Sequence, residues 1–431
     1  MATTLDQYVS RVRAHSDAKK FAELAEMVRN SREMLSKNMA HVANALESFD
    51  AELHTLGVLG ILYAKSTLPS IPDVDGFLTQ IQTFVRVCAT PQISHATDLY
   101  CSLCHCYTKL ILGLKHPIKG IETLKLAVEK LRPTPNHLTS IHADLAQVCL
   151  LSKCFKPVLP FLECDIGDFV QEGNGFDVKM LLLYYYYGGM IYTGIKQFDK
   201  ALFFFEAAVT TPAQAVSAIM LEAYKKYILV SLLLHGKVHA LPRYTSGVVG
   251  RYLKPLCAPY NELTTAYSTN SAAEVQKVVT KHKDAFIKDT NMGLVKQVVA
   301  SRNRKNIQML TKTFLTLSLA DMASRVQLSS PKEAEKCILH MIEDGEIFAT
   351  IDHQNGMVSF RDKPETFADE KMVAMVDSEI HRCMELTKRI QKMDRDMAVN
   401  PQYVKKTLGV QSDDDLALSV TGSHSMESYA M

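Results

Sequence analysis

Residues 313–360 read TFLTLSLADMASRVQLSSPKEAEKCILHMIEDGEIFATIDHQNGMVSF, and this stretch carries a start or stop signal for nearly every element of a small domain. Ser318 followed by Asp321 predicts a helix start, because each side chain can accept a hydrogen bond from the other residue's free backbone N–H. Ser330 followed by Pro331 predicts a second start, since proline at the first helical position loses no hydrogen bond. Two short helices joined by a tight turn are therefore expected.

The end of this stretch has the pattern of a β-hairpin. Gly345 favours the left-handed conformation that ends a helix. Asn355–Gly356 favours a tight turn between two strands. The apolar residues expected along these strands are Ile347, Ala349, Ile351, Met357, Val358 and Phe360. Helix, turn, helix and hairpin together predict a winged helix over residues 313–360.

Winged helices often bind DNA, but the charge of the second predicted helix opposes this function. Residues 331–345 contain two lysines against four carboxylates, and a phosphate backbone would repel such a helix. Basic residues do lie just upstream, namely Arg302, Arg304, Lys305 and Lys312. They form either a solvated helix face or a nucleic-acid contact through Arg302, Arg304 and Lys305, which stays open as an alternative function.

The composition indicates a mainly helical protein. The 431 residues are 47% hydrophobic, which is enough for a sizeable core, and the formal net charge of +2 gives no global attraction for nucleic acid. Nineteen glycines and fifteen prolines are few for this length, which favours helices. Strands are expected only in the hairpin.

The first residues, MATTLDQYVSRVRAHSDAKK, lack the basic start and apolar centre of a secretory signal. No uninterrupted apolar run reaches membrane-spanning length. We therefore expect a protein of the cytoplasm and nucleus without membrane contact. The ten cysteines are expected to be reduced and mostly buried.

Residues 182–208 show tetratricopeptide spacing. The positions that fit the repeat are Leu182, Tyr185, Gly189, Tyr192, Ala201, Phe205 and Ala208. Small residues at such positions let two antiparallel helices approach closely, and Pro212 ends the second helix. Weaker matches to this spacing occur before residue 182. We therefore expect an irregular solenoid of helical repeats over residues 1–196.

A long helix is expected after the winged helix, in residues 366–410. Its apolar residues recur three or four apart and form a narrow seam of Val376, Ile380, Cys383, Leu386, Ile390, Met393 and Met397. Such a seam is typical of a helical bundle, so it either folds back on its own domain or packs among helices of other chains. Residues 411–431 are acidic and rich in serine, and are expected to be disordered, with Ser412 as a possible phosphorylation site.

The sequence contains little that suggests catalysis. Residues 101–106 read CSLCHC, which matches the C-x-x-C-H of haem attachment and half of a zinc site. On a helix, however, Cys101 and Cys104 share one face, as buried core thiols would, and no second pair has zinc spacing. We expect no catalytic residue, no metal site and no cofactor.

Several strings resemble the PCI-domain family, a module shared by the proteasome lid, the COP9 signalosome and a translation initiation factor complex. They are TSIHADL (139–145), LLSKCFKP (150–157), YYYYGGMIYTG (184–194), NMGLVKQ (291–297) and LTKTFLTLSLADMASRVQLS (310–329). Among these complexes the strings are most similar to the signalosome, and a lid subunit stays open as an alternative. The resemblance implies a PCI domain over residues 197–365, which follows the repeats and precedes the long helix.

The resemblance also implies a function. It predicts a non-catalytic subunit of the complex that removes the modifier Nedd8 from cullins and so regulates cullin-RING ubiquitin ligases. In this family, PCI subunits join edge to edge through their winged helices, and their last helices gather in a bundle. The expected partners are therefore other PCI subunits and, indirectly, cullin-RING ligases. The hairpin edge from Met357 to Phe360 and the seam of the long helix are the expected partner-binding surfaces.

Overall fold

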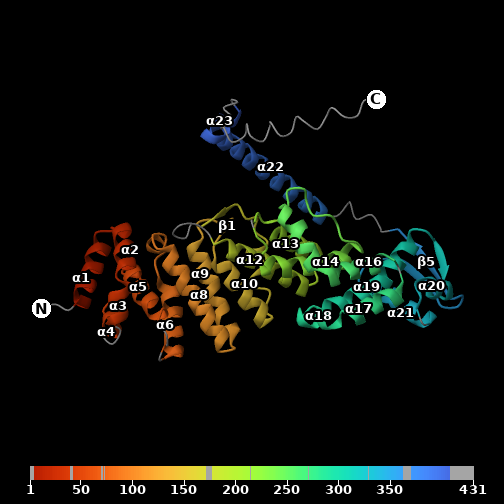
Figure 1. The fold of residues 1–431 in the computed structure, drawn as a ribbon, viewed down its shortest axis with the longest axis horizontal. Helices are drawn as coiled ribbons and strands as arrows, with labels where there is room; N and C mark the ends of the chain where they lie inside the picture. Colours follow the sequence, from red (N-terminus) through yellow and green to blue (C-terminus); the bar gives the residue numbers. More distant parts are fainter. Residues whose placement is uncertain are drawn as a thin grey trace, which may run out of the picture. The chain divides into compact units, whose positions relative to one another are not determined.

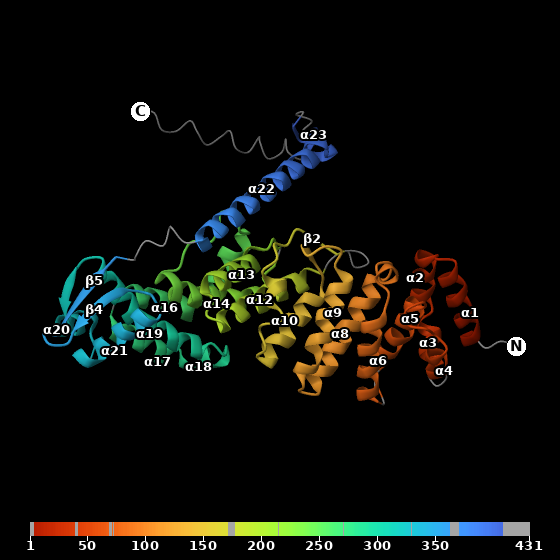
Figure 2. The ribbon, with the colours of Figure 1, turned by 180° about the vertical axis from the view of Figure 1, so that it is seen from behind.

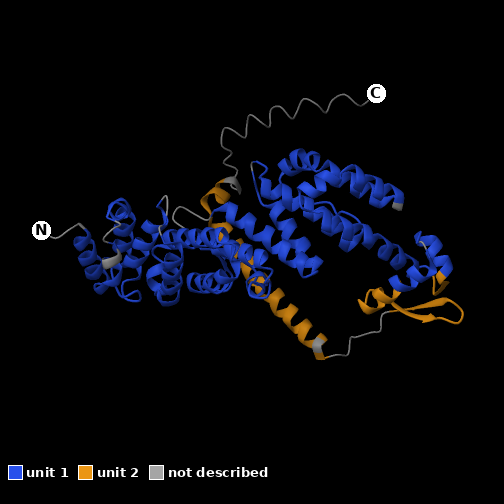
Figure 3. Cartoon of the chain, turned by 90° about the horizontal axis from the view of Figure 1, so that it is seen from below, with its two compact units in different colours: residues 1–313, 320–337 blue, residues 314–319, 338–431 orange. Residues whose placement is uncertain are grey.

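The computed structural model describes residues 4–38, 42–68, 71, 73–170, 177–213, 215–269, 271–328, 330–362 and 370–407. The fold is mostly helical, as predicted, with helical repeats, a winged helix that contains a small sheet, and a C-terminal helix. The chain divides into two compact units, residues 1–313 with 320–337 and residues 314–319 with 338–431 (Figure 3).

Along the first unit, the helices are arranged in space roughly in the order in which they occur in the sequence (Figures 1 and 2). Its first half contains α1 (Thr4–Asp17), α2 (Phe21–Asn30), α3 (Arg32–Lys37), α4 (Val42–Glu47), α5 (Thr55–Ser66), α6 (Val74–Val87), α7 (Thr90–Ile93), α8 (Thr97–Gly113), the 3₁₀ turn η2 (Pro117–Gly120), α9 (Ile121–Leu131), α10 (Ile141–Ser152), α11 (Leu159–Leu162), α12 (Val178–Gly194) and α13 (Phe198–Thr210). Its second half contains α14 (Ala218–His235), the π-helical turn η3 (Val249–Leu253), α15 (Lys254–Leu256), α16 (Ala258–Ser268), α17 (Ala272–Lys281), α18 (Lys283–Lys288) and α19 (Met292–Thr311).

The pair α12 and α13 has the close packing that its repeat spacing predicts. A Cβ added at Gly189 would lie 2.7 Å from the ring of Phe205, so no larger residue fits there without a shift. Phe205, Ala201 and Ala208 are completely buried. The helix α13 ends at Thr210, just before Pro212. The prediction of two closely approaching helices is confirmed.

One expectation about strands is wrong. Two short strands, β1 (His137–Leu138) and β2 (Asp168–Phe169), pair in parallel outside the predicted hairpin. They belong to the loops that follow α9 and α11, and adjacent loops can form a few backbone hydrogen bonds. Strands of two residues have no alternating pattern that a sequence could reveal.

The winged helix consists of β3 (Thr316–Ser318), α20 (Leu319–Val326), α21 (Pro331–Glu343), β4 (Phe348–Asp352) and β5 (Met357–Arg361). Both predicted helix starts are confirmed, and the N–H of Glu333 donates to Ser330 Oγ at 3.3 Å. Gly345 and Gly356 have φ of +70° and +62°, the left-handed conformation that glycine adopts without strain. The predicted helix end and hairpin turn therefore occur at these glycines.

The sheet has three strands in the order β3–β5–β4, and this order corrects one prediction. β5 is the central strand, because Thr316–Ser318 pairs antiparallel with it on one side and Phe348–Asp352 on the other. The residues Met357, Val358 and Phe360 therefore do not form a free edge. The prediction was wrong because β3, which precedes both helices, supplies a second neighbour for β5.

The last described elements are α22 (Glu370–Val399) and α23 (Pro401–Thr407). The predicted tail and Ser412 lie outside the described residues. Among the described helices, none combines the length and the apolar character needed to cross a bilayer.

Candidate interaction surfaces

The predicted seam of α22 is exposed to solvent. Val376, Ile380, Leu386, Ile390, Met393 and Met397 are between 45% and 62% exposed, and Cys383 is exposed too. By contrast, Ile228 and Leu229 in α14 are at most 1% exposed. Large apolar side chains gathered in this way on one surface are typical of an interface with another protein.

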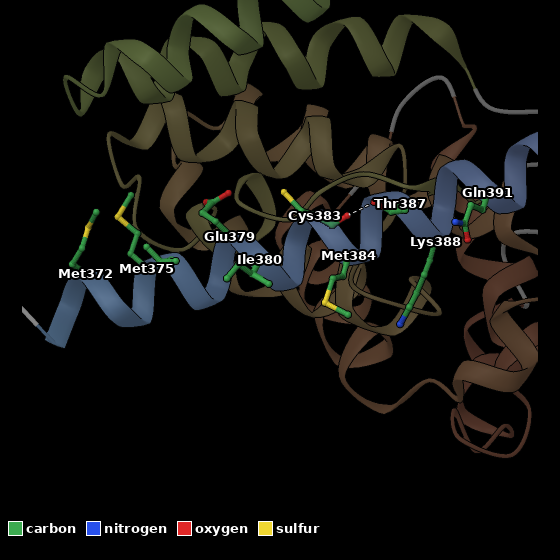
Figure 4. Close-up of a pocket in the computed structure, with 10 residues that line it drawn as sticks. Met372, Met375, Glu379, Ile380, Cys383, Met384, Thr387, Lys388 and Gln391 are labelled. Carbon is green, nitrogen blue, oxygen red and sulfur yellow. Dashed lines mark hydrogen bonds between the residues drawn. The ribbon is translucent and has the colours of Figure 1, made fainter. Parts of the chain in front are cut away.

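Residues 372–391 of α22 line a shallow apolar hollow (Figure 4). Its lining consists of Met372, Met375, Val376, Glu379, Ile380, Cys383, Met384, Thr387, Lys388 and Gln391, all from this one helix. Thr387 donates to the carbonyl of Cys383 at 2.8 Å, so its hydroxyl is satisfied within the helix. Methionine side chains adapt to irregular surfaces, and the hollow therefore suits a protein partner better than a small ligand.

The strand β4 provides a second surface, because it lies at one edge of the sheet. The N–H of Phe360 donates to the carbonyl of Leu315 at 2.8 Å, so the backbone of Phe360 points toward β3. Directly opposite residues of antiparallel strands alternate between hydrogen-bonded and non-hydrogen-bonded pairs. Ala349, opposite Phe360, therefore turns its N–H and C=O away from β5.

Ile351 is two residues further along β4 and has the same orientation as Ala349. The predicted hairpin residues accordingly have different roles. The side chains of Ile347, Val358 and Phe360 are buried, whereas Ala349, Ile351 and Met357 are partly buried. A partner strand would meet the backbone of Ala349 and Ile351, which places the free edge on the first strand of the hairpin instead of the second.

The basic residues proposed for nucleic-acid binding do not form a free surface. Arg302 is only 4% exposed, and burial lowers the pKa of its guanidinium. Lys305 donates to the carbonyl of Leu234 at 2.8 Å, near the end of α14. Arg302 is therefore buried and Lys305 is bonded to α14, because α19 packs against α14, a contact that the sequence did not reveal.

The cysteine cluster in α8 also belongs to the interior. Cys101 and Cys104 are each 2% exposed, as expected of core thiols. His105 Nδ1 is hydrogen-bonded to Asp144 Oδ2 of α10, so this histidine links two helices. In the part of the chain that the structure describes, no three His, Cys, Asp or Glu side chains are grouped to hold a metal ion. His105 therefore has a structural role, because it links α8 to α10.

A buried polar cluster joins α14 to the turn between α18 and α19. Lys225 Nζ lies 2.7 Å from Glu222 Oε1 and 2.8 Å from Asp289 Oδ2. Lys226 donates to Asn291 Oδ1 at 3.0 Å, and burial lowers the pKa of this lysine. Sequence reasoning missed this cluster, because two adjacent lysines in a helix are normally exposed.

Comparisons with known proteins agree with this architecture. A family model described as "COP9 signalosome complex subunit 3, N-terminal helical repeats" matches residues 18–249, and a PCI domain model matches residues 279–362. A Drosophila melanogaster protein named "COP9 signalosome complex subunit 3" is 41% identical over 432 residues, which cover 96% of this chain and 97% of the relative.

A Dictyostelium discoideum protein of the same name is 37% identical over 377 residues, covering 87% of this chain and 90% of the relative. These names favour the signalosome over the proteasome lid. They also confirm the resemblance seen in the strings of residues 139–329. The chain therefore belongs to the COP9 signalosome subunit 3 family.

Proposed function

We propose that this chain is a non-catalytic scaffold subunit of the COP9 signalosome. In this proposal the complex removes Nedd8 from cullins in the cytoplasm and nucleus, and so regulates cullin-RING ubiquitin ligases. The isopeptidase chemistry belongs to another, metal-binding subunit. The names of the relatives support membership of the complex, and the two exposed surfaces support a role in its assembly.

The observation that carries the proposal is the exposed seam of α22. Complete burial of a large apolar side chain contributes about 1.5–3 kcal/mol, so a half-exposed one gains about 1 kcal/mol when a partner covers it. The six large apolar residues of the seam together would gain about 6 kcal/mol, which offsets much of the entropy that association costs. Helices of other subunits are therefore the expected partners of this seam.

The test is to replace Ile390 and Met393 by Asp in the full chain and to co-purify it with the other subunits. We expect the other subunits to be lost, because each aspartate would have to be desolvated in the seam. The isolated variant should keep its helical content, since both side chains are exposed in the chain by itself. Circular dichroism checks the second point.

A matched control replaces Lys392 and Arg395 by Gln, so that both double variants lower the net charge by two. These exposed residues lie on the other side of α22, so this variant should still co-purify. The bundle proposal fails if the Ile390→Asp, Met393→Asp chain retains its partners. It fails also if both double variants lose them equally, because charge rather than the seam would then be responsible.

A further inference from the structure

Three turns between helices of the repeats share an unusual concentration of lysine. They are residues 113–120 after α8, 152–158 after α10 and 194–200 after α12. Together they contain six lysines and one aspartate, whereas the whole chain has a net charge of only +2. We call five of these residues the basic edge: Lys115, Lys119, Lys153, Lys156 and Lys196.

The three turns lie side by side. The helices α8, α10 and α12 contact one another in order, and η2 in the first turn contacts α10 (Figure 1). Because η2, which follows α8, contacts α10, and the end of α12 contacts the turn after α10, the carboxyl ends of the three helices share one edge of the repeats. At Gly194 a Cβ would lie 3.1 Å from the ring of Phe155, which places the third turn against the second.

The charges of the basic edge are accessible and uncompensated. All five lysines are exposed, and no carboxylate among the described residues forms an ion pair with them. Lys200 shows the contrast, because its Nζ lies 2.9 Å from Glu163 Oε1. The edge therefore keeps a positive potential that is free to attract an anionic partner.

Three of the five lysines occupy backbone positions that would suit glycine better. Lys115, Lys153 and Lys196 have φ of +58°, +57° and +67°, a conformation in which glycine is the least strained residue. Lysine near the end of a helix is favoured by the helix dipole, which explains part of the pattern. Lys119, however, lies just before the start of α9, where the dipole disfavours a cation.

We infer that the basic edge binds an extended acidic polypeptide segment of a partner protein. Neighbouring helices lie 8–10 Å apart, so the edge extends about 20 Å, which an extended segment of about six residues spans. The whole chain has a net charge of only +2, so the positive potential is confined to this edge, which suits a short acidic segment better than a long polyanion such as nucleic acid. The basic edge shares no residue with α22 or β4, so it serves a contact beyond the proposed assembly function.

The experiment uses the full chain and a fluorescent Glu-rich peptide of about ten residues, with fluorescence anisotropy as the readout. The test variant carries Lys115→Gly, Lys153→Gly and Lys196→Gly. Glycine suits the left-handed conformation, so this variant removes three charges and relieves backbone strain at the same positions. The control carries Lys277→Gln, Lys283→Gln and Lys288→Gln, an equal loss of charge from exposed positions on α17 and α18.

We expect the peptide to bind the wild-type chain in a salt-sensitive manner. The test variant should bind about ten-fold more weakly and the control within about two-fold of the wild type. Three results would overturn the inference: no binding by the wild type, an equal loss in both variants, or tighter binding of duplex DNA than of the peptide at the same edge.

Discussion

Gly189 lies where α12 and α13 approach each other closely. The ring of Phe205 occupies the space that a side chain at position 189 would need, and Phe205 is itself completely buried. Gly188 has the same relation to Phe204, whose ring would lie 2.5 Å from an added Cβ. The two glycines therefore set the distance between the helices of this repeat.

We expect Gly189→Ala to destabilise the chain by about 1–3 kcal/mol, because the added methyl group would overlap the buried ring of Phe205. Urea unfolding measures this loss. Gly113→Ala is the matched control, since a Cβ at the end of α8 meets no atom within 4 Å. The packing argument would be wrong if the two variants were equally stable.

At the scale of single residues, contacts between residues at regular spacing could be predicted from the sequence. The small residues of α12 and α13 recur at repeat positions, so their close packing could be predicted. Arg302 and Lys225 could not be placed, because their burial depends on helices distant in the sequence. Arg302 lies in α19, which packs on α14, and Lys225 finds its partner Asp289 in a turn 64 residues later.

At the scale of elements, β4 is the edge strand whose backbone is free to pair. We expect Ala349→Pro to leave the fold intact, because the N–H that proline removes points away from β5. The same change should weaken binding to a neighbouring subunit if that subunit adds a strand here. Thermal unfolding of the isolated chain and co-purification with the complex check the two expectations.

Thr350→Pro is the matched comparison for the edge strand. Thr350 lies opposite Ser359 in a hydrogen-bonded pair, so proline would break the sheet itself and lower the unfolding temperature. If the Ala349→Pro chain assembled as well as the wild type, β4 would not be the strand that a neighbour extends.

The hairpin was predictable because its signals are local: Gly345, Gly356 and the alternating residues between them. Which strand forms the free edge of the sheet could not be predicted from the sequence. The strand β3 has three residues and lies about 40 residues before its partner β5, so no local sequence pattern indicates that the two strands pair. Since a third strand changes which backbone is free, one missed element moved the candidate interface from β5 to β4.

At the scale of the whole molecule, the buried polar cluster joins the segments that the two family models match. Lys225 and Lys226 lie in residues 18–249, whereas Asp289 and Asn291 lie in residues 279–362. The contacts place residues 18–249 and the helices α18 and α19 of the second segment in one compact unit. Helical repeats and PCI helices should therefore unfold together.

We expect Asp289→Ala to destabilise this junction by about 3 kcal/mol, because it leaves the buried Lys225 with one carboxylate fewer. Hydrogen exchange should then become faster in α16 to α19 before it does in α8 to α13. Asp284→Ala, on the exposed side of α18, serves as the control and should exchange like the wild type. Unchanged protection in the Asp289→Ala chain would show that the cluster does not join the segments.

The spacing of the seam on α22 also determines how a partner must approach it. Val376, Cys383, Ile390 and Met397 recur at every seventh residue, and seven residues fall short of two full helical turns by about 20°. Over these three heptads the stripe rotates by about 60° around the helix. A straight neighbouring helix would lose contact with it, so helices that follow the whole stripe must wind around α22 in a left-handed supercoil.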